Sequence, residues 1–369
     1  MSTAPDVRTI SQPSPVGSST PWLRTAGYAV VVAGVGAAGV AFGLWGNERI
    51  GPRDPAAQRV AVADPGGLTT SGLPIVKLVV VVAVVGTIGM LVAALLLPRQ
   101  DGRFGEPARR CLRSAGWLAV TWAVAMAALL VLSWSDVARV PVTMATVYQI
   151  FSGPEHLPYA VPYLYSAWLA VVIAAGAFVL RNALGVAALL LLCGYTVLPL
   201  TMRGQQVHGA AIGLVVTVHV LAIAVWVGTL AALLAHARRS PASLAVAAPR
   251  FSRLALACFV VVGAFGLTAA WINLGSLSAL GGSHFGTLVV YKVEAFVALG
   301  LFGWWHRRRT IPEIRQKSSI RPFVRFAAIE VMVMVAAIGL GIALSRASAP
   351  AAPIPVTHKP NPYTGVMGP

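Results

Sequence analysis

Two histidines in one apolar segment, residues 207–234, have the chemistry to bind a metal ion or carry a proton. His208 and His219 are eleven residues apart. On a helix they therefore lie about 20° apart around the axis and about 16 Å apart along it. Trp226 follows on the same face. The opposite face carries small residues in four-residue steps, which predict close packing against a neighbouring helix. An imidazole at mid-membrane depth is unfavourable unless it is paired or functional, so we predict that His219 is a ligand or a proton carrier. The alternative to a functional role is a solvated position for His208 and an interfacial anchor for Trp226.

Two sulfur side chains occupy the preceding apolar segment. Cys193 and Met202 precede the histidines by a short turn, and antiparallel pairing of the two segments places Cys193 at about the depth of His219. Thiolate, thioether and imidazole groups favour Cu(I) and also suit haem iron or zinc. We predict that Met202, His208, Cys193 and His219 form a descending line of metal ligands. The alternative is that both sulfur side chains are ordinary core residues.

The last two apolar segments contain ionisable side chains. Lys292 and Glu294 are two residues apart, so they lie on nearly opposite faces of a helix and do not pair within it. Glu330 lies about two turns into the final apolar segment. Because carboxylates inside a membrane are candidates for function by default, we predict an ion or proton path along Trp226, Lys292, Glu294 and Glu330. Polar contacts between helices, and a lysine that reaches the surface, are the alternatives.

The elements that must position these residues are membrane helices. The 369 residues are 57% hydrophobic and 11% charged, which is too apolar for a soluble domain. Backbone groups in lipid must be paired within their own segment, so the apolar runs have to be helical. We predict an all-α, polytopic transmembrane helix bundle of about nine spans. The expected spans are residues 26–45, 74–97, 114–134, 160–181, 183–202, 207–234, 254–274, 287–305 and 326–345.

The distribution of charge predicts the orientation of the bundle. The chain carries a net charge of +17, and its Lys and Arg residues are concentrated in alternate loops, above all 99–113 and 306–325. This is the pattern of the positive-inside rule, and it argues against nucleic-acid binding. It places the N-terminus in the cytoplasm and the C-terminus outside. The predicted organisation is a disordered cytoplasmic tail (1–25), five membrane helices (26–203), four further membrane helices (204–348) and a Pro-rich extracytoplasmic tail (349–369).

Several functional classes lack their motifs. The three cysteines form no CxxC pair, so neither a disulfide framework nor a zinc ribbon is expected. The sequence contains no phosphate-binding Walker A motif and no nucleophile elbow. We therefore predict that the chain is not an enzyme.

Four segments of the last 40% of the chain, taken in order, resemble the copper resistance D (CopD) family of bacterial inner-membrane proteins. They cover about residues 204–348. The segments are HGAA with VHVLAIAVWVGTLAAL, RFSRLALACFVVVGAFGLTAAW, FGTLVVYKVEAFVALG and RFAAIEVMVMVAAIGL. The residues that match the family's patterned positions are His208, His219, Trp226, Lys292 and Glu330. Cys193 and Met202 have no support from the resemblance.

The resemblance implies a function in copper homeostasis and resistance. The family is implicated in moving copper across the bacterial cytoplasmic membrane into the cytosol, so copper, as Cu(I), is the expected cargo and membrane lipid the expected surroundings. Longer relatives carry a fused extracytoplasmic copper-binding domain or an oxidase assembly domain, and neither is recognisable in this sequence. We therefore expect a separate extracytoplasmic copper-binding protein or a respiratory oxidase as a partner.

Two other functions remain as alternatives. The first is a membrane redox protein that binds haem b, although His208 and His219 are too far apart to ligate one iron and each would need a partner from another helix. The second is an assembly factor that delivers copper to a respiratory oxidase without transporting it.

Overall fold

The computed structural model describes part of the chain as a bundle of helices with one small hairpin. The described residues are 65–100, 103–143, 147–148, 150, 160–203, 210–237, 240–274, 276–282, 284–305, 308 and 327–335. The helices are α2 (Gly67–Leu96), α3 (Glu106–Ala138), α5 (Ala160–Val179), α6 (Ala183–Arg203), α7 (Ala210–Ala232), α8 (Pro241–Leu274), α9 (Ala279–Gly282) and α10 (His284–Trp305). A π-helical turn, η3 (Leu233–Ala237), extends α7, and residues 327–335 are also helical.

Six of the described helices are long and apolar enough to cross a membrane: α2, α3, α5, α6, α7 with η3, and α8. This confirms the prediction of an all-α, multi-pass membrane protein. The expected first span, most of the ninth and both terminal tails lie outside the described residues. The number of nine spans and the orientation of the bundle therefore stay predictions.

Three helices begin well before the apolar segments that predicted them. α2 begins at Gly67, seven residues before the expected start. α3 begins at Glu106, eight residues before the expected start, and α8 begins at Pro241, thirteen residues before it. In α3 the extra turns are stabilised by Pro107 near the helix start and by ion pairs from Glu106 to Arg109 (3.0 Å) and Arg110 (3.1 Å). Hydropathy detects only the part of a helix that lies in lipid, so a polar first turn escapes it.

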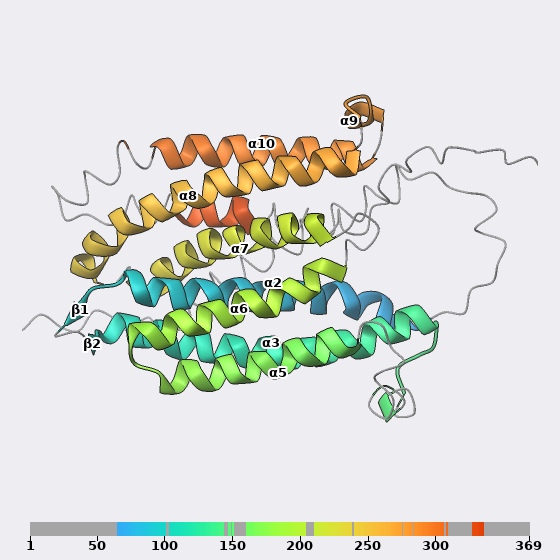
Figure 1. Cartoon of the computed structure of the whole chain (residues 1–369), viewed down its shortest axis with the longest axis horizontal. Helices are drawn as coiled ribbons and strands as arrows, with labels where there is room; N and C mark the ends of the chain where they lie inside the picture. Colours follow the sequence, from blue (N-terminus) through green and yellow to red (C-terminus); the bar gives the residue numbers. More distant parts are fainter. Residues whose placement is uncertain are drawn as a thin grey trace, which may run out of the picture.

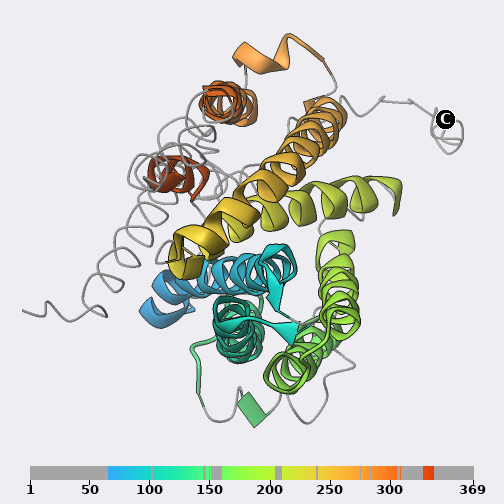
Figure 2. The same ribbon diagram turned by 90° about the vertical axis from the view of Figure 1, so that its left-hand side faces the viewer.

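The helices run side by side along the long axis of the molecule (Figure 1). α2 packs between α3 and α7, α5 lies against α3 and α6, and α8 crosses over α7. In the end view, α10 and the helical residues 327–335 lie beyond α8 and α7, on the side away from α3 and α5 (Figure 2). One continuous core joins residues of α2, α3, α5, α6, α7 and α8 with residues 327–335.

The closest contact in the bundle joins α2 and α7 at two glycines. A β-carbon added to Gly89 of α2 would overlap the backbone of Gly228 in α7. One added to Gly228 would overlap the carbonyl oxygen of Val85 and lie 2.9 Å from the Cα of Gly89. Gly228 belongs to the stripe of small residues opposite His219, which the sequence predicts to be a packing face: Gly213, Thr217, Ala224, Gly228, Ala231 and Ala235. The prediction is confirmed at Gly228.

A short hairpin connects α2 to α3. β1 (Arg99–Gln100) pairs antiparallel with β2 (Arg103–Phe104), and only Asp101 and Gly102 separate the strands in the sequence. Asp-Gly is a favoured pair for a two-residue hairpin. At the same end of the bundle, Arg250 of α8 donates a hydrogen bond of 2.9 Å from Nη1 to the carbonyl oxygen of Leu96. This bond satisfies a carbonyl at the end of α2 that has no partner within its own helix.

Candidate functional site

The side chain of His219, a residue of α7, lies between α7 and α8. Its Nδ1 is 3.1 Å from the carbonyl oxygen of Val262. A carbonyl oxygen only accepts hydrogen bonds, so Nδ1 carries the hydrogen in this contact. In the neutral ring, Nε2 then presents a lone pair. A backbone carbonyl bonded to the far nitrogen is the usual way in which proteins orient a metal-binding imidazole.

A glycine in α8 provides the space for the imidazole ring. A β-carbon at Gly266 would lie 2.8 Å from Cε1 and 3.1 Å from Nδ1 of His219. A real β-carbon does not approach a ring carbon so closely, so any larger residue would push the ring away from Val262. Val262 and Gly266 are one turn apart on α8, and together they hold the imidazole.

α6 and α7 are neighbours, as the sequence predicts. The hydroxyl groups of Thr201 and Thr217 are 2.5 Å apart, and Gly194 faces Leu221. The hydrogen bond of His219, however, is to Val262 of α8, and its ring lies against Gly266 of the same helix. Cys193 is fully buried in α6, and its thiol is free.

The predicted ligand set can be followed only in part. The backbone of Met202 lies in the last turn of α6, but the structure does not describe its side chain. His208 lies outside the described residues. Within the part of the chain that is described, no three His, Cys, Asp or Glu side chains lie close enough together to hold a metal ion. The set of Met202, His208, Cys193 and His219 therefore stays a prediction.

The ionisable residues of the last segments have different surroundings. Lys292 is half-buried in α10, whereas Glu294, two residues further, is exposed on the surface of the bundle. Glu330 is 6% exposed and packs among residues that belong to the main core. Of the two carboxylates predicted to line a path, only Glu330 faces the interior.

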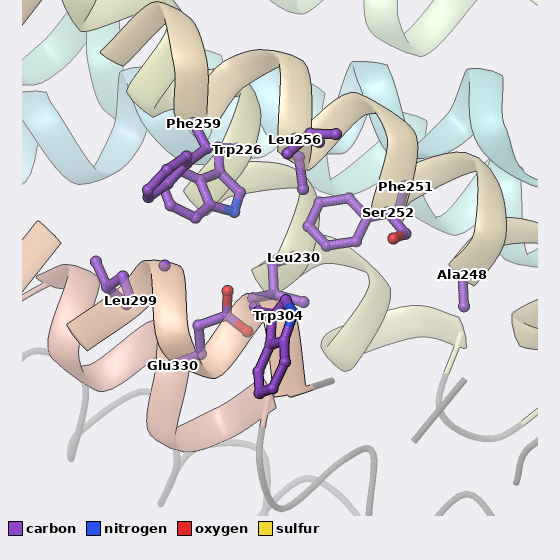
Figure 3. A pocket seen from close by; sticks show the side chains of 13 residues that line it. Trp226, Leu230, Ala248, Phe251, Ser252, Leu256, Phe259, Leu299, Trp304 and Glu330 are labelled. Atoms are coloured by element: carbon purple, nitrogen blue, oxygen red, sulfur yellow. The ribbon is translucent and has the colours of Figure 1, made fainter. Parts of the chain in front are cut away.

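Glu330 and Trp226 meet in a pocket of about 190 Å³ (Figure 3). The walls come from α7, α8, α10 and the helical residues 327–335. The lining is Trp226, Leu230, Ala248, Phe251, Ser252, Ala255, Leu256, Phe259, Leu299, Gly300, Gly303, Trp304 and Glu330. His219 and Trp226 are seven residues apart on α7, and both contact α8. Trp226 lines the pocket, whereas His219 does not.

Three aromatic rings are in contact beside this pocket, and two of them, Trp226 and Phe259, line it. Trp226 meets Phe259 edge to face, with ring centroids 5.8 Å apart, and Phe259 stacks on Phe296 at 4.2 Å. Two glycines make room for the stack, because a β-carbon at Gly300 would lie 2.8 Å from Phe259 and one at Gly263 would lie 3.0 Å from Phe296. α8 and α10 thus each insert a ring opposite a glycine of the other.

The sequence reasoning missed the aromatic residues that line the pocket with Trp226. Phe251 and Phe259 are eight residues apart, with Ala255 halfway, so they lie on one face of α8. That face continues through Val262 to Gly266, which contact His219. A search of α8 for a face of rings and small residues would have found it.

The comparison with known families identifies the region that contains α8 and α10. A family model described as copper resistance protein D matches residues 245–344. This region is therefore similar to the CopD family. The match includes Lys292 and Glu330, whereas α7 with His219 lies before it. A search of curated proteins and a search of solved structures each gave no match. The chain is therefore a multi-pass membrane protein with a CopD region, and that family relates it to copper resistance.

Proposed function

We propose that the chain carries copper, as Cu(I), across the bacterial cytoplasmic membrane into the cytosol. The CopD region supports copper as the cargo. The observation that carries the proposal is the position of His219, whose imidazole is held by the carbonyl of Val262 with Nε2 left to act as a ligand. An imidazole suits copper better than it suits the hard cations, which prefer oxygen ligands. Copper is the substrate here, and no chemical reaction is required of the chain.

The pathway continues toward Glu330. His219 and Trp226 face α8 together, and Trp226 opens into the pocket that contains the Glu330 carboxyl group. His219 and Trp226 are seven residues apart on α7, or about 10 Å along the helix axis. We propose that copper leaves the imidazole along this face and that Glu330 balances charge or accepts a proton. Met202 and His208 would receive the ion on the outer side, and Cys193 would hold it together with His219 at mid-depth.

Copper uptake by proteoliposomes tests the proposal. Vesicles that contain the purified chain are given Cu(I) with a reducing agent, and internal copper is measured by mass spectrometry after removal of external metal. We expect uptake well above that of protein-free vesicles. Copper that binds tightly to the protein without entering the vesicles would contradict transport and would favour the delivery of copper to an oxidase. A haem absorption band in the purified protein would favour the redox alternative.

Gly266→Ala tests the position of the His219 imidazole between Val262 and Gly266 without removing the imidazole. The added methyl group would displace the His219 ring from Val262, because the β-carbon would lie 2.8 Å from Cε1. Loss of a partner that orients a metal ligand lowers metal affinity roughly 10- to 100-fold. We expect that loss in a competition titration with a Cu(I) chelator.

The matched control for this variant is Gly281→Ala in α9, outside the pocket, where a β-carbon meets no described atom within 4 Å. This variant should bind copper as the wild type does. Equal Cu(I) affinities of Gly266→Ala and the wild type would show that copper binding does not depend on the contacts of His219 with Val262 and Gly266.

A further inference from the structure

The pocket beside Trp226 contains a polar atom that the bundle leaves without a partner. Trp226 is 5% exposed, and its Nε1 has no hydrogen-bond partner among the described residues. Leaving a buried donor unpaired is unfavourable, and most buried N–H groups in proteins are paired. Figure 3 shows the nitrogen edge of Trp226 facing the same space as the carboxyl group of Glu330. A ligand that accepts a hydrogen bond at this position would satisfy the indole.

The walls of the pocket suit a flat ring. Phe251, Phe259 and Trp304 contribute aromatic surface, and α10 contributes bare backbone at Gly303, where a β-carbon would meet no described atom within 4 Å. The volume of about 190 Å³ suits one ring system and is smaller than a typical site for a drug-sized ligand. An acyl chain would fit such walls, but it has no acceptor for the Trp226 N–H group.

The entrance of the pocket faces the surroundings of the bundle. Leu256 and Trp304 line the pocket and are 48% and 52% exposed. The guanidinium group of Arg308 lies 4.7 Å from the centre of the Trp304 ring, a pair typical of the membrane–water interface. The ligand would therefore enter from the lipid phase, close to the level of the headgroups.

We propose that this pocket binds the ring of a lipid-soluble quinone or its quinol. One ring oxygen accepts the hydrogen bond from Trp226 Nε1, and the oxygen across the ring faces Glu330. A carboxyl group offers several hydrogen-bonding positions, so Glu330 can serve the ligand beside the contacts that it already makes. As a carboxylate it accepts from a quinol hydroxyl, and as a carboxylic acid it donates to a quinone carbonyl. The proposal concerns binding only and does not depend on copper transport.

Equilibrium binding of decylubiquinone to the metal-free protein tests this proposal. The protein is purified in detergent with a copper chelator present, and binding is measured by isothermal titration calorimetry. We expect saturable binding by the wild type. Trp226→Phe keeps an aromatic ring but removes the donor, and it should weaken binding roughly tenfold, as expected for one lost hydrogen bond. Gly303→Leu places a side chain in the open space and should weaken binding more than tenfold.

The control is Gly281→Leu, which makes the same substitution at a glycine of α9 that also has no described neighbour within 4 Å of its β-carbon. This variant should bind as the wild type does, and melting temperatures should show that all variants are folded. No saturable binding by the wild type, or equal binding by Gly303→Leu and Gly281→Leu, would overturn the proposal. Saturable binding of tetraethylammonium without binding of decylubiquinone would also overturn it, because the site would then be one for organic cations.

Discussion

His219→Ala is expected to reduce copper uptake by proteoliposomes at least tenfold and to leave the bundle folded. The substitution removes the one imidazole that the described residues place inside the membrane-spanning part of α7, together with its hydrogen bond to Val262. The space is bounded by Gly266, and α8 also contacts α7 elsewhere, through Trp226 and Phe259. Folding should therefore survive the loss of the ring, whereas a ligand cannot be replaced by a methyl group.

His236→Ala is the control for this experiment. It makes the same substitution in η3, the continuation of the same helix, where Nε2 of His236 is 3.0 Å from the hydroxyl group of Ser114. We expect near wild-type uptake from this variant. If His219→Ala transports copper at the wild-type rate with the same vesicle content of protein, then the imidazole is not on the route and the proposed function loses the observation that carries it.

Gly228→Leu is expected to prevent α2 and α7 from packing and to lower the stability of the bundle severely. A β-carbon at this position already overlaps the carbonyl oxygen of Val85, so every residue larger than glycine forces the two backbones apart. Overpacking of a tight core typically destabilises by about 1–3 kcal/mol, and here backbone rather than side chain would have to move. The expected result is a large fall in melting temperature in detergent, or loss of the folded protein from membranes.

Gly194→Ala serves as the matched control for the crossing. Its β-carbon would lie 3.7 Å from Cδ1 of Leu221, which is an ordinary contact between α6 and α7. The melting temperature should stay close to that of the wild type or rise slightly, because alanine favours a helix more than glycine does. A Gly228→Ala variant as stable as Gly194→Ala would show that the α2–α7 crossing is looser than the structure indicates.

The sequence predicted the spans and the packing face of α7 because both depend on local pattern. Long apolar runs indicate the helices, and small residues in four-residue steps indicate where a backbone can approach, as Gly228 does. The starts of α3 and α8 were wrong by eight and thirteen residues, because charged residues interrupt the apolar pattern near each start: Glu106, Arg109 and Arg110 in α3, and Arg250 and Arg253 in α8. Glu106 with its two arginines was the available signal in α3.

The partner of His219 could not be predicted from the sequence. The short segment between α6 and α7 in the sequence predicts that these helices are neighbours, and the hydroxyl groups of Thr201 and Thr217 do meet. The position of His219 around the axis of α7 does not determine which helix packs against it, because the packing depends on where α8 crosses α7. The pocket depends on the same crossing, together with residues 327–335, which are close to it in space and distant in the chain.

The glycine crossing of α2 and α7 restricts how the bundle can move. A slide by one turn would bring the side chains of Val85 or Ala224 onto the opposite backbone, so the two helices can pivot at Gly89 and Gly228 but cannot slip. His219 is nine residues from this fulcrum, or about 13 Å. A tilt of about 10° would carry the imidazole ~2 Å, enough to break its 3.1 Å contact with Val262. A small rotation of α7 at Gly228 would therefore be enough to separate the imidazole of His219 from Val262.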